Sequence, residues 1–66
     1  MRRAEARDAL RKFMISQREL MVSVSLTQRS MRILGYTYAE IDYAADSIGL
    51  EKVPTEYGLY YKRNLY

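Results

Sequence analysis

The chain contains no cysteine and no histidine among its 66 residues. Without cysteine there are no disulfides and no thiolate chemistry, and without either residue type nearly all transition-metal sites are excluded. The usual general base and the strongest nucleophile of enzymes are absent with them. The composition therefore predicts a protein that is not an enzyme, that uses no cofactor and that holds no metal.

Long apolar runs are also missing. No segment approaches the roughly 20 apolar residues that a membrane span needs, and the basic start, residues 1–8, leads into mixed charge rather than into an apolar signal core. We therefore expect a cytoplasmic protein without membrane contact. Residues 1–66 suffice for one domain. Domains this small are often stabilised by oligomerisation or by a partner.

The net charge of +3 is distributed unevenly along the chain. Residues 1–35 hold eight Lys or Arg against three Asp or Glu, whereas residues 36–66 hold three against five. A basic end of this kind suits nucleic-acid phosphate or an acidic protein. A solvated basic helix without a partner explains the pattern equally well.

Residues 2–21 contain neither Gly nor Pro and are rich in good helix formers, which predicts a long first helix. Apolar positions recur in it at spacings of three and four, as in a coiled-coil seam. The seam consists of Ala6, Leu10, Phe13, Gln17, Leu20 and Val24. The strip beside it consists of Arg3, Arg7, Arg11 and Arg18. The strip can follow a phosphate backbone or frame a dimer interface, but the favoured interpretation is that the seam covers the other helices.

A sharp corner between two helices is the clearest local signal. Residues 22–26 alternate like a strand, but Ser25 with Gln28 makes a capping-box pair, which favours a helix over residues 26–34. Gly35 stands where a helix end needs a positive φ angle. Thr37 and Glu40 then form a second capping box, which begins a helix over residues 38–48.

Aromatic residues flank this corner and fill the C-terminal part. Tyr36 and Tyr38 are expected in the core, since they occupy cap and stripe positions. In residues 50–66, Pro54 favours a short helix over 54–63, whereas the aromatic run 59–61 favours a strand. A short hairpin, like the wing of a winged-helix protein, is the alternative. The expected fold is thus all-α: a small three-helix bundle with a helix-turn-helix-like corner and a short C-terminal helix or hairpin.

Two stretches resemble the helix-turn-helix superfamily. Residues 35–41, Gly-Tyr-Thr-Tyr-Ala-Glu-Ile, are similar to the start of the first motif helix in sigma-factor-like domains. Residues 45–50, Ala-Asp-Ser-Ile-Gly-Leu, are similar to the Ala-x-x-Leu-Gly-Val turn of such proteins, although a few extra residues separate the halves. The resemblance implies a recognition element at about residues 54–64.

The other register makes Gly35 the turn glycine and residues 38–48 the recognition helix. That helix carries Glu40, Asp42 and Asp46 and no Lys or Arg. An acidic helix is not expected beside phosphates in the major groove, and this register is therefore rejected. Asp42 and Asp46 are spaced to hold a divalent cation, but an exposed acidic face is the favoured interpretation.

The resemblance implies a small, non-enzymatic DNA-binding regulator that acts as a dimer. Its candidate phosphate contacts are Arg7, Arg11, Arg29, Arg32, Lys52, Lys62 and Arg63. The alternative is a small interaction protein or inhibitor, of the kind common in phages and mobile elements, that docks on a larger nucleic-acid-handling protein. Its candidate contacts are Asp42, Asp46, Tyr57, Tyr60 and Tyr61, within an aromatic tail that ends at Tyr66. That tail suits base stacking, a protein interface or packing on the bundle.

Overall fold

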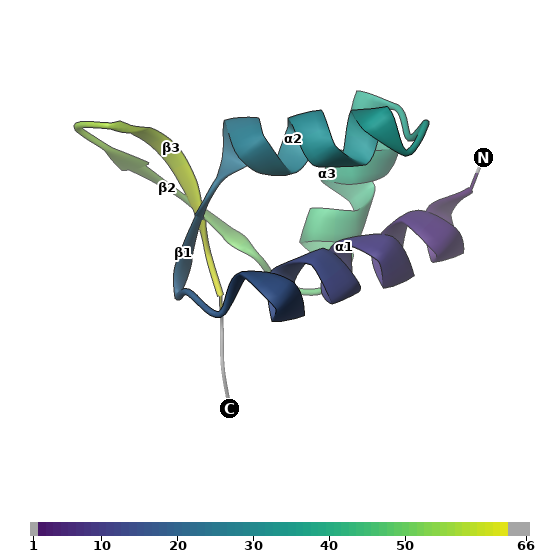
Figure 1. Cartoon of the computed structure of the whole chain (residues 1–66), viewed down its shortest axis with the longest axis horizontal. Helices are drawn as coiled ribbons and strands as arrows, with labels where there is room; N and C mark the ends of the chain where they lie inside the picture. The colour runs from purple at the N-terminus through teal and green to yellow at the C-terminus, as the bar shows by residue number, and fades with distance from the viewer. Residues whose placement is uncertain (1, 64–66) are drawn as a thin grey trace.

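The computed structural model describes residues 2–63 and contains both helices and strands. The three strands form one antiparallel sheet in the order β1-β3-β2 (Figure 1). The expectation of an all-α fold is therefore wrong, and the fold is α+β. The elements are α1 (Arg3–Gln17), β1 (Met21–Ser23), α2 (Val24–Ile33), α3 (Tyr38–Ser47), β2 (Glu51–Thr55) and β3 (Gly58–Lys62).

The hairpin of β2 and β3 replaces the helix that was favoured over residues 54–63. Pro54 lies in the edge strand β2 opposite Leu59. The pair that flanks a two-residue turn is hydrogen-bonded, and bonded and non-bonded pairs alternate along the ladder. The nitrogen of Pro54 therefore faces away from β3, where its missing N–H breaks no ladder bond. Of the two interpretations of this segment, the hairpin is confirmed.

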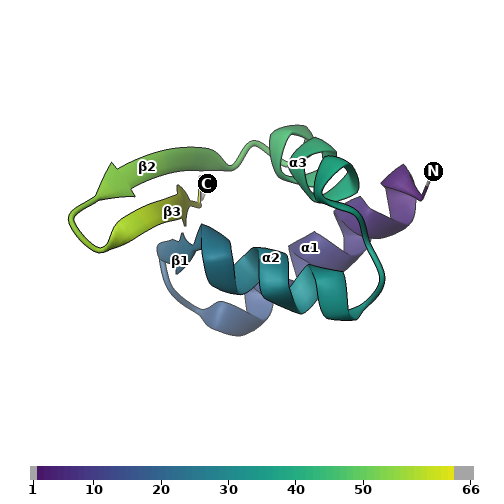
Figure 2. The same cartoon turned by 90° about the horizontal axis from the view of Figure 1, so that it is seen from above.

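The turn of this hairpin is held by the side chain of Thr55. Its hydroxyl donates a hydrogen bond to the Gly58 carbonyl at 2.8 Å and accepts one from the Tyr57 backbone N–H at 3.1 Å. Gly58 begins β3 with a φ of 124°, a conformation that side-chain-bearing residues rarely adopt. The hairpin projects from the helical part of the molecule (Figure 2).

A short strand precedes α2 where a break was expected. β1 pairs with the end of β3, and the Arg63 N–H donates to the Leu20 carbonyl at 2.8 Å. The first helix consequently ends at Gln17 and not at residue 21. The N-terminal capping residue of α2 also differs from the predicted one: the hydroxyl of Ser23, not of Ser25, accepts a hydrogen bond from the Leu26 N–H at 3.3 Å.

The corner between α2 and α3 forms as the sequence predicts. Gly35 has a φ of 95°. The Thr37 hydroxyl accepts from the Glu40 N–H at 3.1 Å, and the Glu40 carboxylate accepts from the Thr37 N–H at 2.8 Å. The capping box is therefore confirmed, and α3 begins at Tyr38.

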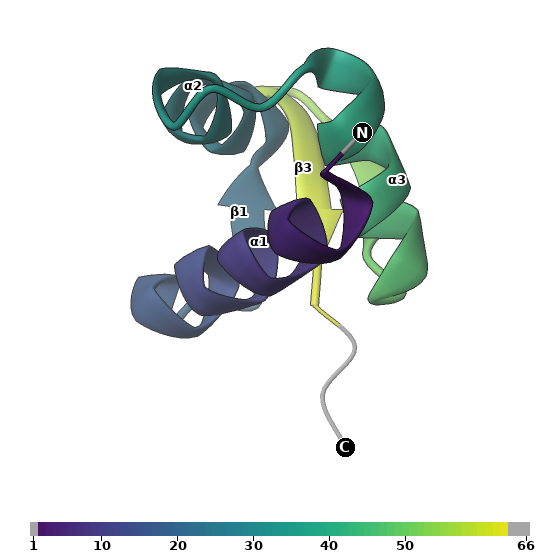
Figure 3. The same ribbon diagram turned by 90° about the vertical axis from the view of Figure 1, so that its right-hand side faces the viewer.

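The core lies where α1, α3 and the sheet meet. α1 packs mainly against α3, with the sheet behind them (Figure 3). The residues with no exposed surface include Leu10, Ile41 and Tyr61. The predicted seam of α1 is partly correct: Ala6 and Leu10 are buried, but Leu20 is exposed. Met14 is buried instead, since it lies one turn after Leu10 on the same helix face, whereas Leu20 lies beyond the end of the helix.

None of the helices within residues 2–63 combines the length and the apolar character required to cross a bilayer.

Candidate nucleic-acid interface

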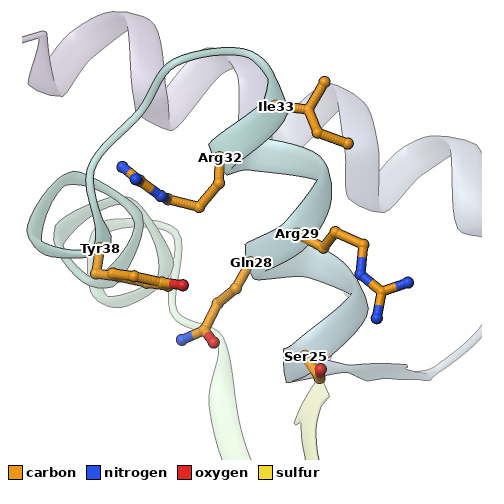
Figure 4. A pocket seen from close by; sticks show the side chains of 6 residues that line it. All are labelled: Ser25, Gln28, Arg29, Arg32, Ile33 and Tyr38. Atoms are coloured by element: carbon orange, nitrogen blue, oxygen red, sulfur yellow. The ribbon is translucent and has the colours of Figure 1, made fainter.

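An open hollow lies on the outer face of α2, beside the first residue of α3 (Figure 4). We call it the α2 hollow, and it is lined by Ser25, Gln28, Arg29, Arg32, Ile33 and Tyr38. The first four residues recur at spacings of three and four, so they share one face of the helix. Two guanidinium groups, one amide and two hydroxyls line it, and no carboxylate from the described residues does. This is the composition expected of a site for an anion.

Arg32 is held in place within the α2 hollow. Its Nη1 donates to the Tyr36 carbonyl at 3.0 Å. Its guanidinium carbon lies 5.1 Å from the centre of the Tyr38 ring, within the range of a cation–π contact. Only one of its five N–H donors is engaged in that hydrogen bond. A guanidinium that is already ordered loses less conformational entropy when it binds a ligand.

Arg29 is exposed and has no ion-pair or hydrogen-bond partner among residues 2–63. Figure 4 shows it extending from α2 on the side of Ser25, whereas Arg32 and Gln28 extend toward Tyr38. Ser25 lies in the first turn of α2, where the helix dipole adds partial positive charge. The α2 hollow therefore carries two arginine charges that no carboxylate of the described residues pairs with.

The other predicted cations are not brought to this hollow. Lys62 pairs with Met21, at the end of β1 that is remote from α2. The guanidinium of Arg63 donates to the Glu19 carbonyl at 3.2 Å, near the end of α1. Lys52 lies on β2, with its Nζ 3.7 Å from the Asp42 carboxylate. The seven predicted phosphate contacts therefore do not form one surface.

The arginine strip of α1 is partly engaged in attaching α1 to the rest of the fold. The guanidinium of Arg3 stands 4.7 Å from the centre of the Tyr43 ring on α3. Arg7 is half-buried, and its Nε is buried without a hydrogen-bond partner in the described residues. Arg11 lies 3.8 Å from the Asp8 carboxylate, and both side chains are exposed. Arg29 and Arg32 are thus the only two of the seven that share a described hollow.

The tyrosines differ from the sequence expectation in two places. Tyr38, expected in the core, is exposed and lines the α2 hollow, whereas Tyr36 is buried as expected. The ring of Tyr61, expected at a partner surface, is fully buried, because it lies on the face of β3 that is turned toward the helices. Its neighbour Tyr60 points to the other face of the sheet and is half-buried.

The hairpin has an aromatic outer surface. Tyr57 at the turn is 82% exposed. A second open hollow there is lined by Met21, Pro54, Thr55, Glu56, Tyr57 and Tyr60. Of the three tyrosines predicted to contact a partner, Tyr57 and Tyr60 lie together on this surface. Tyr66 and residue 64 lie outside the described residues.

Helices lie on both sides of the turn at Gly35. α2, the turn at Gly35 and α3 form the corner, whereas strands and not a helix follow residues 45–50. The recognition element expected at 54–64 is a β-hairpin as far as Lys62. The objection to α3 remains, because it exposes Asp42 and Asp46 and carries no Lys or Arg. Glu40, however, is buried and is not part of this acidic face.

No family model matches the chain, and no curated protein or solved structure matches it. Its function is therefore inferred from its own geometry.

Sequence reasoning missed Ser25, Gln28 and Tyr38 as members of the hollow. Ser25 and Gln28 were assigned to a capping box, and the spacing that places them on one face with Arg29 and Arg32 was the available signal. Tyr38 had no such signal, because its exposure depends on how α3 packs against α2.

Proposed function

We propose that the protein is a small, non-enzymatic regulator that binds nucleic acid through the α2 hollow. One observation carries the proposal: Arg29 and the pre-ordered Arg32 share a concave surface that no carboxylate of the described residues lines. Guanidinium groups form charge-assisted, often bidentate hydrogen bonds to phosphate. Gln28 and the hydroxyls of Ser25 and Tyr38 add donors of the kind that contact phosphate and sugar.

The order of elements supports the same proposal. An α-β-α-α-β-β chain with strand order β1-β3-β2 is similar to the arrangement of winged-helix domains. In helix-turn-helix proteins the first helix of the motif crosses the phosphate backbone and the second enters the major groove. α2 occupies the first position and has the charge for that role. α3 occupies the second position and has the wrong charge for a groove.

We therefore expect phosphate contacts to dominate binding. Such contacts set affinity and position on the duplex but carry no sequence information. Binding of a random-sequence duplex should be detectable at low salt and should weaken steeply as salt is raised, because bound counterions are released from the duplex.

The test replaces Arg29 with alanine and measures binding of a fluorescent 20-base-pair duplex by anisotropy at several salt concentrations. We expect R29A to weaken binding about 3- to 10-fold at low salt and to reduce the slope of log affinity against log salt by about one, since one phosphate contact is lost.

Lys12→Ala is the matched control. Lys12 is exposed on α1, so the variant loses the same charge away from the α2 hollow. Equal losses in R29A and K12A would show that net charge alone governs binding. Absence of duplex binding by the unmodified protein at low salt would exclude the proposal altogether.

A further inference from the structure

A third hollow lies between α3 and β2, and we call it the acidic hollow. It is lined by Asp42, Ala45, Asp46, Leu50, Lys52 and Tyr61. Asp42 and Asp46 are four residues apart, so their carboxylates project from the same side of α3. Both side chains are exposed. Two carboxylates against one lysine leave a net negative charge at this position.

The hydroxyl of Tyr61 is the second notable feature of the acidic hollow. The side chain is fully buried, and its oxygen has no hydrogen-bond partner among the described residues. Burial, and then the nearby charge of Asp42, raise the pKa of Tyr61. The hydroxyl is thus neutral and close enough to Asp42 to sense its charge. A buried hydroxyl without a partner is costly, so a ligand that offers a donor is favoured here.

A cation of the chain itself already lies in the acidic hollow. The Nζ of Lys52 is 3.7 Å from the Asp42 carboxylate, and the two side chains are 47% and 56% exposed. Exposed pairs of this kind contribute little free energy. The Lys52 ammonium therefore shows that a cation can occupy this position. Because its ion pair with Asp42 is weak, a better donor can displace the ammonium.

Arginine fits this set of groups better than the alternatives. A guanidinium has five donors in a planar fork, enough for two carboxylates and a phenol oxygen, whereas an ammonium has three on one atom. Ala45 and Leu50 offer apolar surface for the methylene stem. A divalent cation prefers six or more oxygen ligands, and residues 2–63 contain no group of three acidic side chains placed to hold one.

We propose that the acidic hollow binds an arginine side chain from a basic segment of a partner protein. The guanidinium lies between Asp42 and Asp46 in place of the Lys52 ammonium. It donates to the Tyr61 hydroxyl once Lys52 has moved away, because that hydroxyl is covered in the unbound chain. Charge complementarity selects the partner, since this hollow is acidic while the α2 hollow is basic. The inference does not depend on nucleic-acid binding by α2.

The test titrates the full chain with a hexa-arginine peptide at low salt and follows backbone amide signals by NMR. We expect the largest shifts at Asp42, Asp46 and Leu50, and weaker binding of hexa-lysine by about threefold or more, because the ammonium cannot bridge both carboxylates.

Two variants test the chemistry of the acidic hollow. Asp46→Asn should weaken binding of hexa-arginine about fivefold, since it removes one charged acceptor. Tyr61→Phe keeps the ring in the core and removes only the hydroxyl, so it should fold and weaken binding about two- to threefold. Lys52→Gln should strengthen binding, because it removes the internal competitor.

Glu56→Gln is the matched control for charge. Glu56 lies in the hairpin turn and is exposed, so this variant loses the same charge away from the acidic hollow and should bind hexa-arginine as the unmodified protein does. Equal weakening by E56Q and D46N would overturn the proposal, as would an unchanged affinity in Y61F. Concentration-dependent shifts at Asp42 and Asp46 without peptide would overturn it in favour of a second copy of the chain. Equivalent shifts with calcium chloride would overturn it in favour of a cation.

Discussion

At the scale of one residue, Glu40 takes part both in a local helix cap and in a contact with a residue that is distant in the sequence. The sequence predicts its part in the capping box with Thr37, because both partners are three residues apart. The second carboxylate oxygen also accepts a hydrogen bond at 2.7 Å from the backbone N–H of Arg2, 38 positions earlier in the chain. The guanidinium of Arg2 in turn donates to the Gly35 carbonyl and lies 4.5 Å from the Tyr36 ring centre. One carboxylate thus joins α1 to the corner.

This arrangement makes stability depend on pH. Hydrogen bonds from Thr37, and then from Arg2, lower the pKa of Glu40 below its ordinary value of 4.5. Because the folded state has the lower pKa, the stabilisation is fully present above the unfolded value and is lost as the pH falls through the folded value. We expect the free energy of unfolding to decrease as the pH falls below about 4.5.

Glu40→Gln tests this contribution. The amide cannot accept both backbone hydrogen bonds as a carboxylate does, so E40Q should lower the melting temperature at pH 7 and show a flatter dependence of stability on acid pH. Thermal unfolding followed by circular dichroism measures both. Glu56→Gln, at an exposed turn, should resemble the unmodified protein. A melting temperature of E40Q equal to that of E56Q at pH 7 would contradict the role of Glu40.

At the scale of elements, the helices were predictable because their signals are local. Thr37, Glu40 and Gly35 lie within six residues and determine the corner by capping and by a positive φ angle. The sheet was not predictable in this way. β1 is three residues long and exists only because β3, which begins 35 positions after the end of β1, pairs with it. Pro54 was therefore assigned to a helix start, although its place is a free strand edge.

Pro54 protects the free edge of β2 against pairing with another strand. Along this edge the outward-facing pairing groups belong to Lys52 and Pro54, because they alternate with the residues that bond to β3. Pro54 has no N–H to offer, and proline at an edge blocks the addition of another strand. The short edge is therefore closed to pairing with a second copy of the chain.

Pro54→Val should open this edge. Valine restores an outward N–H and has a high strand propensity, so the hairpin should remain while self-association increases. Sedimentation velocity over a range of concentrations measures the change. Leu59→Val, at the paired position in β3, alters no edge donor and should stay in the same state as the unmodified protein. Identical sedimentation of all three proteins would show that Pro54 does not guard the edge.

At the scale of the whole molecule, the basic first half and the acidic second half of the sequence do not fold into separate basic and acidic regions. The candidate site was predictable in part. Arg29 and Arg32 were among the seven predicted phosphate contacts, but only the fold shows that these two line the hollow and the other five do not. Tyr38 lines the α2 hollow and Asp42 lines the acidic hollow, and these residues are four apart on α3. They share one side of that helix, so the basic and acidic hollows are neighbours.

Neighbouring hollows of opposite charge should influence each other's ligands. Asp42 and Asp46 lie one and two helical turns from Tyr38 on α3. Their carboxylates repel a phosphate backbone bound at α2, most strongly at low salt, where the Debye length reaches about 30 Å. Removing both charges with Asp42→Asn and Asp46→Asn should therefore tighten binding of the random duplex about 3- to 10-fold at low salt, and less as salt rises. Anisotropy with the same labelled duplex measures the change.

The double variant Glu5→Gln and Glu56→Gln removes the same charge from exposed positions outside both hollows. If it tightens duplex binding as much as the Asp42 and Asp46 pair does, net charge is the cause and the two hollows act independently. If the Asp42 and Asp46 pair has the larger effect, and if that effect shrinks when Arg29 is also replaced by alanine, the carboxylates act on a phosphate held at α2. An arginine bound in the acidic hollow would then neutralise the same two charges, so a basic partner and a nucleic acid would bind this chain cooperatively.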